Sequence, residues 1–264
     1  MTFQKTYDII KSENNRTFKG EEWTMCKLKS AIILKDRIFM PDYDSHSKML
    51  EELGITDDYF NASKVFVRAE LVPENGNVFS NIDDWKLEVD QDITPEWFDE
   101  KDCTERMRKA VKEWANTHIF IGQNDLKISH GENIFIKDCK NVDICGNATV
   151  NNICGNATVD YICGNVTVEN IYDKATVNNI CGDATVENIC GNATVKSICG
   201  NATVKYIYDN AMVISSRDTK WNNSASLIIA DNATFKDCYS RTIYQAGGWE
   251  FVEVKNNRRR KENV

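Results

Sequence analysis

Residues 144–215 read ICGNATVNN ICGNATVDY ICGNVTVEN IYDKATVNN ICGDATVEN ICGNATVKS ICGNATVKY IYDNAMVIS, which is one nine-residue unit repeated eight times without an insertion. A strict short period of this kind is typical of a β-solenoid, because one unit cannot enclose a core alone and neighbouring units must stack to make a continuous one. The repeat therefore decides the fold of the middle of the chain. It says less about function, since the residues that recur are mainly those that pack or turn.

Departures from the consensus indicate how many units make one coil, because nine residues are too few to enclose a packed core. In every second unit the position after isoleucine is always cysteine: Cys145, Cys163, Cys181 and Cys199. In the other units this position alternates between two residue types: Cys154, Tyr172, Cys190 and Tyr208. A coil of two units stacks like on like, whereas a coil of three units mixes the two series. We therefore predict coils of two units, about 18 residues, that rise roughly 4.8 Å each.

Within a unit, alternation predicts which side chains face the core. Ala148 and Val150 are two residues apart and share a face, with Thr149 on the other face. Ile153 is out of phase with Val150, so a bend must follow the two variable residues and divide the unit into ATVNN and ICGN. Glycine and asparagine suit the second bend because both tolerate left-handed backbone conformations. The predicted interior is therefore Ile, Ala and Val from every unit.

The five-residue half of the unit resembles the pentapeptide-repeat proteins, whose consensus is Ala, Asp or Asn, Leu and two free positions. The matching segments are ATVNN, ATVDY, VTVEN, ATVNN, ATVEN, ATVKS and ATVKY, beginning at residues 148, 157, 166, 175, 184, 193 and 202. The resemblance implies a right-handed, roughly square β-helix. The alternation of five and four residues departs from that family and makes a flatter, two-sided coil the alternative. Several members of the family look like acidic rods that imitate DNA, so the resemblance also implies a nucleic-acid mimic.

The 264 residues allow one or two domains with an ample core. No apolar run is long enough to span a membrane and no signal-peptide stretch begins the chain, so we expect a soluble, cytoplasmic protein without a membrane partner. Six of the ten cysteines are placed by the repeat. We expect these six to be reduced, as is usual in the cytoplasm, and not to bind metal, because an in-line ladder lacks tetrahedral geometry.

The fold class that we predict is an α+β N-terminal domain followed by a β-solenoid, with about 18 residues per coil, and a C-terminal cap. The acidic α+β domain is assigned to residues 1–125, and the solenoid to residues 126–237. An insertion at 216–228 interrupts the period, which resumes once from Ile229. Residues 238–264 are assigned to the cap and a basic tail.

Local patterns predict the elements of the N-terminal domain. Strand character marks residues 30–40, 64–71 and 85–89, and helical character marks residues 47–53 and 103–116. The longer helix carries an apolar stripe that recurs at three and four residues, which indicates one buried face.

The net charge of −8 is unevenly distributed. Residues 51–100 hold 14 acidic and 3 basic side chains, a local balance of −11, whereas the eight repeats hold 6 acidic and 3 basic ones. If the protein imitates nucleic acid, the imitation therefore lies in the N-terminal domain. The candidate partner-binding residues are acidic residues of this domain and tyrosines of the repeats: Asp57, Asp58, Asp83, Asp84, Asp90, Asp92, Tyr161, Tyr172, Tyr206 and Tyr208.

Catalytic chemistry has little support in the sequence. Asp42, Asp44 and His46 stand at alternate positions and could present three metal ligands, but we favour a polar turn before a helix because no second ligand cluster has suitable spacing. There is neither a phosphate-binding glycine loop nor a dinucleotide fingerprint. The repeat also lacks the aspartate in every unit that a calcium-binding β-roll needs. We therefore predict no catalytic residues, no metal and no cofactor.

Three hypotheses of function remain. The favoured one is a non-enzymatic interaction protein, a rigid β-solenoid scaffold that binds a macromolecular partner, a protein and not nucleic acid. The alternative is an acidic, nucleic-acid-mimicking inhibitor of a host or defence enzyme, as a phage-borne protein would be. The third is an enzyme in the N-terminal domain whose solenoid serves oligomerisation. Homo-oligomerisation stays open in all three.

Overall fold

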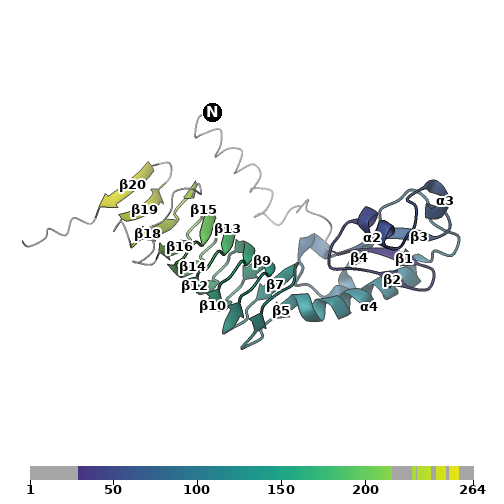
Figure 1. Cartoon of the computed structure of the whole chain (residues 1–264), viewed down its shortest axis with the longest axis horizontal. Helices are drawn as coiled ribbons and strands as arrows, with labels where there is room; N and C mark the ends of the chain where they lie inside the picture. The colour runs from purple at the N-terminus through teal and green to yellow at the C-terminus, as the bar shows by residue number, and fades with distance from the viewer. Residues whose placement is uncertain (1–28, 216–227, 230, 239–241, 248–249, 256–264) are drawn as a thin grey trace, which may run out of the picture. The chain divides into compact units, whose positions relative to one another are not determined.

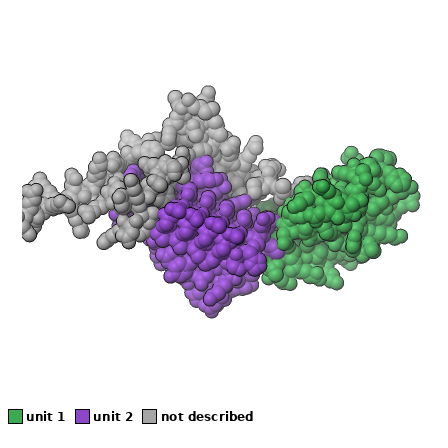
Figure 2. Space-filling model, in the orientation of Figure 1, with its two compact units in different colours: residues 1–117 green, residues 118–264 purple. Residues whose placement is uncertain are grey.

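The computed structural model describes residues 29–215, 228–229, 231–238, 242–247 and 250–255. The chain divides into two compact units at the boundary between Thr117 and His118 (Figure 2). This boundary lies before the one predicted at residue 125. The basic tail and nearly all of the predicted insertion lie outside the described residues.

The first unit is built on a four-stranded antiparallel sheet with the order β2-β1-β3-β4. Its strands are β1 (Lys29–Leu34), β2 (Ile38–Phe39), β3 (Phe66–Val72) and β4 (Lys86–Val89). Its helices are α2 (His46–Glu52), α3 (Tyr59–Ala62) and α4 (Glu100–His118), with two 3-10 turns, η1 (Glu74–Gly76) and η2 (Ile82–Asp84). The predicted strands and both predicted helices are confirmed. The first strand prediction corresponds to the β1–β2 hairpin.

Helix α4 extends three residues before its predicted start because Asp99 caps it, accepting a hydrogen bond from the backbone of Asp102 at 2.8 Å. Its apolar stripe is buried at Met107, Val111 and Trp114. Arginine side chains of the helix donate hydrogen bonds to backbone carbonyl oxygens at the sheet. Arg106, for example, donates to the carbonyl oxygen of Leu34 at 2.8 Å.

The second unit is a β-solenoid in which each coil adds one strand to each of two parallel sheets. The odd sheet consists of β5 (Ile119–Ile121), β7 (Ile134–Lys137), β9 (Thr149–Cys154), β11 (Thr167–Ile171), β13 (Thr185–Ile189), β15 (Thr203–Ile207) and β17 (Ile228–Ile229). The even sheet begins with β6 (Lys127–Ile128), β8 (Val142–Ile144), β10 (Thr158–Ile162), β12 (Thr176–Ile180), β14 (Thr194–Ile198), β16 (Met212–Ser215) and β18 (Thr234–Asp237). Successive strands of each sheet stack side by side in Figure 1.

The strand register confirms that one coil holds two repeat units. Thr158 pairs with Thr176 in the even sheet, and Thr167 pairs with Thr185 in the odd sheet. Each residue therefore stacks on its equivalent, as the two cysteine series predicted. Each of the two repeat units in a coil contributes one strand to one of the two sheets, and the two sheets enclose the core.

Every repeat fills the core with the predicted residues. Ala148, Val150 and Ile153 are all fully buried, as are their equivalents in nearly every unit. Val150 and Ile153 both point inward although they are three residues apart, because the ladder skips the residue after Val150 and resumes at Asn152. The predicted bend is thus part of the strand.

Both ends of the solenoid extend beyond the perfect repeats. The first strand, β5, precedes the predicted start at residue 126, and Ile134, Ile136 and Val142 are buried in the early coils. Near the other end the separation of stacked residues grows from 18 to 22. The even sheet then continues as two antiparallel strands, β19 (Thr242–Gly247) and β20 (Glu250–Lys255), so parallel stacking stops at β18. These two strands are the C-terminal cap.

Candidate interaction surfaces

The two corners of the coil differ in chemistry. The cysteine corner comprises residues 145–147, 163–165, 181–183 and 199–201, and leads from the even sheet to the odd sheet. The mixed corner comprises residues 154–156, 172–174, 190–192 and 208–210, and leads back. At both corners the second residue has a positive φ, which the cysteine corner meets with glycine alone and the mixed corner with glycine and aspartate in turn.

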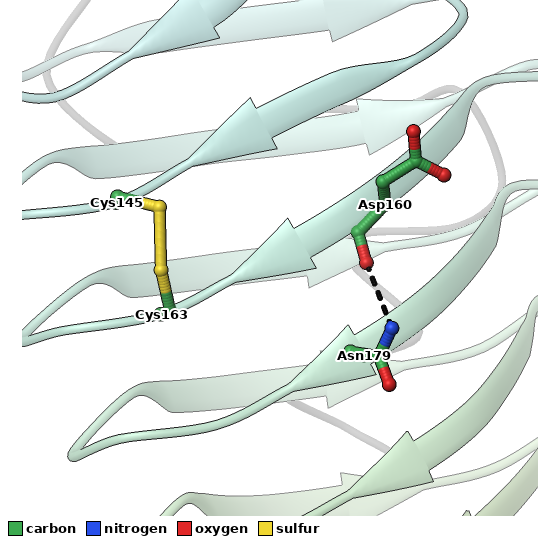
Figure 3. Close-up of a disulfide and its surroundings, with 4 residues drawn as sticks. All are labelled: Cys145, Asp160, Cys163 and Asn179. Atoms are coloured by element: carbon green, nitrogen blue, oxygen red, sulfur yellow. Dashed lines mark hydrogen bonds between the residues drawn. A yellow bond between two sulfur atoms is a disulfide. The ribbon is translucent and has the colours of Figure 1, made fainter.

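Cys145 and Cys163 form a disulfide at the cysteine corner, with their Cα atoms 4.7 Å apart (Figure 3). The expectation that all repeat cysteines are reduced is therefore wrong for this pair. The physical reason is the stacking of like on like, which holds consecutive thiols of the column at a separation that a disulfide spans. Cys154, Cys181, Cys190 and Cys199 are free thiols.

The mixed corner encloses two of the four candidate tyrosines. The hydroxyl of Tyr172 is hydrogen-bonded to Cys154, and that of Tyr208 to Cys190. Burial raises the pKa of Cys154 to about 11 and that of Cys190 to about 12, against the opposite effect of these hydrogen bonds. A buried, protonated thiol is chemically inert, so this corner is a packing feature. Tyr172 and Tyr208 therefore offer little of their side chains to a partner.

The other two candidate tyrosines lie on the outer faces of the sheets. Tyr161 is 49% exposed on the even sheet. Tyr206 is half-buried on the odd sheet, where it follows a ladder of asparagine amides: Asn188 donates to Asn170 at 3.1 Å, and Asn170 to Asn152 at 3.3 Å. On the even sheet the amide of Asn179 donates to the carbonyl oxygen of Asp160 (Figure 3). Amide ladders of this kind hold the outer faces of the solenoid in register.

A column of charged residues runs along the odd sheet. Glu169 stacks between Asn151 and Glu187, and Lys205 donates to Glu187 at 3.2 Å. Burial, with the charge of Glu187 in addition, raises the pKa of Glu169 above its ordinary value. Glu169 in its ionised form therefore opposes folding.

The substitution Glu169→Gln is expected to stabilise the solenoid at about pH 7 by up to about 1 kcal/mol, because it removes a carboxylate that burial, and secondarily the charge of Glu187, disfavour. A carboxyl group whose pKa is raised by folding destabilises the folded state above that pKa. Below the unfolded value the group is protonated in both states, so the advantage of glutamine should disappear as the pH falls. Thermal unfolding of both proteins across this range measures the difference. Glu187→Gln is the control, because it removes the ion pair with Lys205. Equal stability of wild type and Glu169→Gln at neutral pH would contradict the raised pKa of Glu169.

Several candidate acidic residues of the first unit hold its loops in place. Asp57 accepts two hydrogen bonds from Arg68, both at 2.9 Å, and Asp58 caps α3 by accepting from the backbone of Asn61 at 2.8 Å. Asp83 pairs with Lys112, and Asp90 lies 3.2 Å from the imidazole of His46. Asp84 and Asp92 form no ion pair within the described residues. The prediction that these six bind a partner stays a prediction.

The alternative metal ligands are also occupied by contacts within the unit. Asp44 accepts from the ammonium group of Lys29 at 3.1 Å and from the backbone of Ser30 at 3.2 Å. His46 is the first residue of α2 and lies within hydrogen-bonding distance of Asp90 and of the carbonyl oxygen of Ala69. A polar, non-helical segment precedes α2, and Ser45 is the cap of this helix. Within the described ranges, no three His, Cys, Asp or Glu side chains gather as a metal site.

Sequence reasoning missed the most exposed apolar side chains of the described chain. Tyr59 and Phe60 in α3 are 74% and 61% exposed. The signal was present, since two aspartates and two aromatic residues follow one another at 57–60. In a sequence, however, aromatic residues beside an apolar helix more often indicate core. We call residues 57–60 the α3 patch.

Comparisons with family models, with curated proteins and with solved structures find no match for this chain. None of the helices in the described part of the chain is both long and apolar enough to cross a membrane.

Proposed function

We propose that this chain is a non-enzymatic interaction protein that binds a protein partner through the α3 patch and uses the solenoid as a scaffold. The observation that carries the proposal is the exposure of Tyr59 and Phe60 side by side on one short helix. Aromatic side chains, tyrosine above all, contribute much of the energy of protein–protein binding, and they lose little conformational entropy when they become ordered.

The α3 patch is held in place before any partner arrives. Asp58 caps α3, and the adjacent Asp57 accepts two hydrogen bonds from Arg68 of β3. The ammonium group of Lys64 lies over the ring of Phe60 at 4.5 Å from its centroid. A helix whose backbone is already held in place favours affinity because less motion is lost on binding.

The solenoid supports the same function with long, regular outer faces. Tyr161 and the similarly exposed Met212 both belong to the even sheet, which makes this sheet the second candidate surface. Membership of the pentapeptide-repeat proteins remains a proposal based on the ATVxx segments. A cytoplasmic location is likewise proposed on sequence grounds alone.

The double substitution Tyr59→Ala and Phe60→Ala is expected to reduce partner binding at least tenfold, because loss of one hot-spot side chain typically weakens a complex by about 2 kcal/mol or more. The measurement is capture from the native cytosol with quantitative mass spectrometry, followed by titration of each captured protein against purified wild-type and substituted chains. Ile121→Ala is the matched control, since Ile121 is a 50% exposed apolar residue of the other unit.

The outcome distinguishes a true contact from a folding defect. Both variants should unfold at the wild-type temperature, because the removed side chains pack against little. If the double variant binds every captured protein as tightly as the Ile121→Ala control does, the α3 patch is not the binding site.

An acidic nucleic-acid mimic is the second candidate, and the local balance of −11 over residues 51–100 favours it. Binding would then be to a basic protein and would weaken steeply with salt. Asp84→Lys with Asp92→Lys is the suitable charge reversal, because neither residue forms an ion pair within the described chain, whereas Asp83 pairs with Lys112 and Asp90 contacts the imidazole of His46. Unchanged affinity and salt dependence in this variant would exclude the mimic.

A further inference from the structure

The column of four cysteines at the cysteine corner places free thiols beside the disulfide. Cys145, Cys163, Cys181 and Cys199 occupy the same position in four consecutive coils. The first two are joined, and the other two are partly exposed free thiols. One disulfide therefore lies next to two thiols in a single line.

The three neighbouring pairs of this column have the same backbone geometry. Each cysteine from Cys163 onward donates its backbone N–H to the isoleucine before the preceding cysteine: Cys163 to Ile144 at 2.8 Å, Cys181 to Ile162 at 2.8 Å, and Cys199 to Ile180 at 2.9 Å. The corner asparagines repeat the same step, since Asn165 bonds to Asn147 at 3.2 Å and Asn201 to Asp183 at 2.9 Å. The backbone separation that permits the Cys145–Cys163 disulfide therefore recurs between Cys163 and Cys181 and between Cys181 and Cys199.

One neighbouring pair of this column is already bonded, and another is in contact. The Cys181 thiol is hydrogen-bonded to Cys199, and the Cys145–Cys163 bond runs from one coil to the next (Figure 3). Cys181 is the next cysteine beyond Cys163 along this direction. Thiol–disulfide exchange requires a thiolate that attacks one sulfur while the other leaves, and the column supplies this arrangement.

We propose that the cysteine corner is a thiol–disulfide exchange site, along which one disulfide moves between the three neighbouring pairs of the column. In the first step the Cys181 thiol gives its proton to water, and the thiolate attacks Sγ of Cys163. The Cys163–Cys181 bond forms as the Cys145–Cys163 bond breaks, and Cys145 leaves as a thiolate that takes up a proton. In the second step Cys199 attacks Cys181 in the same way and releases Cys163.

Each step conserves electrons, so exchange within the column needs no oxidant. Exchange changes which pair of coils is cross-linked and which thiols are free. When the bond joins Cys145 and Cys163, the free thiols are Cys181 and Cys199. When it joins Cys181 and Cys199, the free thiols are Cys145 and Cys163. In the cytoplasm, where we propose that the protein resides, disulfides are usually transient or redox-active. A movable bond at a solvent-facing corner fits that behaviour better than a fixed structural cross-link.

The positions of the lysines make the three linkages separable by trypsin. Cleavage after Lys140, Lys174, Lys196 and Lys205 gives peptide 141–174 with Cys145 and Cys163, peptide 175–196 with Cys181, and peptide 197–205 with Cys199. The first linkage lies within one peptide, the second joins 141–174 to 175–196, and the third joins 175–196 to 197–205. Cys154→Ser and Cys190→Ser in the full chain remove the mixed-corner thiols that share two of these peptides.

The experiment begins with this chain oxidised by limiting glutathione disulfide to one disulfide per molecule, as checked by intact mass. After removal of the oxidant, the chain is incubated above the thiol pKa, because burial and the neighbouring Cys199 raise the pKa of Cys181. Exchange is then stopped with acid and N-ethylmaleimide before digestion. We expect all three linkages, within about tenfold of one another, since the three pairs are nearly equivalent.

Cys181→Ser is the matched control, because it interrupts the column while leaving the first pair intact. Only the linkage within peptide 141–174 should then be found. The proposal is overturned if the chain with all four column cysteines also retains this single linkage after incubation. It is also overturned if peptide 141–174 is joined to 197–205 as often as to its neighbour, because that product needs unfolded chains. Fragmentation of the same peptides from the unsubstituted chain provides the test if the double serine background fails to fold.

Discussion

Gly164→Ala is expected to destabilise the solenoid by about 2–5 kcal/mol, the sum of a left-handed backbone penalty and a steric one. Gly164 has φ +79°, and a Cβ atom there would lie 2.7 Å from the carbonyl oxygen and 2.9 Å from the backbone nitrogen of Gly146. Both are backbone atoms of the adjacent coil, so no side-chain rotation relieves the contact. To accept the methyl group, the two coils would have to separate at the cysteine corner, where backbone hydrogen bonds join them.

The measurement is chemical denaturation of wild type and variant under reducing conditions, so that the disulfide next to Gly164 does not contribute. Gly122→Ala is the matched control, because Gly122 has a similar φ of +64° in the same unit and no atom within 4 Å of the place that the added methyl group would take. This control should lose only the backbone penalty of about 1–2 kcal/mol. Equal losses in the two variants would show that close approach of the coils does not require glycine.

Lys29→Met is expected to destabilise the first unit by about 3–5 kcal/mol, because it leaves one partner of a buried pair without its counter-charge. The side chain of Lys29 is completely buried and that of Asp44 is 17% exposed. The ammonium group also donates to the carbonyl oxygen of Pro41 at 2.6 Å and lies 5.4 Å from the ring centroid of Trp114. Removing the cation therefore leaves Asp44 with fewer hydrogen bonds in a low-dielectric position.

A double-mutant cycle tests this explanation. Lys29→Met combined with Asp44→Asn should lose less stability than the sum of the two single changes, because the second change removes the unpaired charge. Lys112→Met is the comparison for an exposed pair: Lys112 and Asp83 are 48% and 56% exposed, and a pair of this kind contributes only about 0–1 kcal/mol. Strict additivity of the Lys29 and Asp44 changes would contradict a coupled, buried pair.

The candidate surfaces were less predictable than the fold, and particular residues show why. Tyr161 and Tyr172 occupy different positions of the unit, and only the coil geometry shows that one faces water while the other bonds to a buried thiol. Asp57 and Asp90 contribute to the acidic charge of residues 51–100, yet their partners, Arg68 and His46, are distant in sequence. A count of charges in a sequence does not indicate which charges are already paired. The α3 patch was missed for the same reason, because exposure depends on what packs nearby.

Local periodicity in the sequence was enough to predict the coil of two repeat units, the inward-facing Ile, Ala and Val, and the elements of the first unit. In such patterns each residue constrains its near neighbours, and repeats of the same kind stack on one another. The pairs of side chains that meet across coils and loops, including the disulfide at the cysteine corner and the ion pair of Lys29, became known from the folded chain alone. The repeat period placed Cys145 and Cys163 in one column, but the bond between them and the ion pair of Lys29 depend on distances of a few ångströms, which no local pattern of residues encodes.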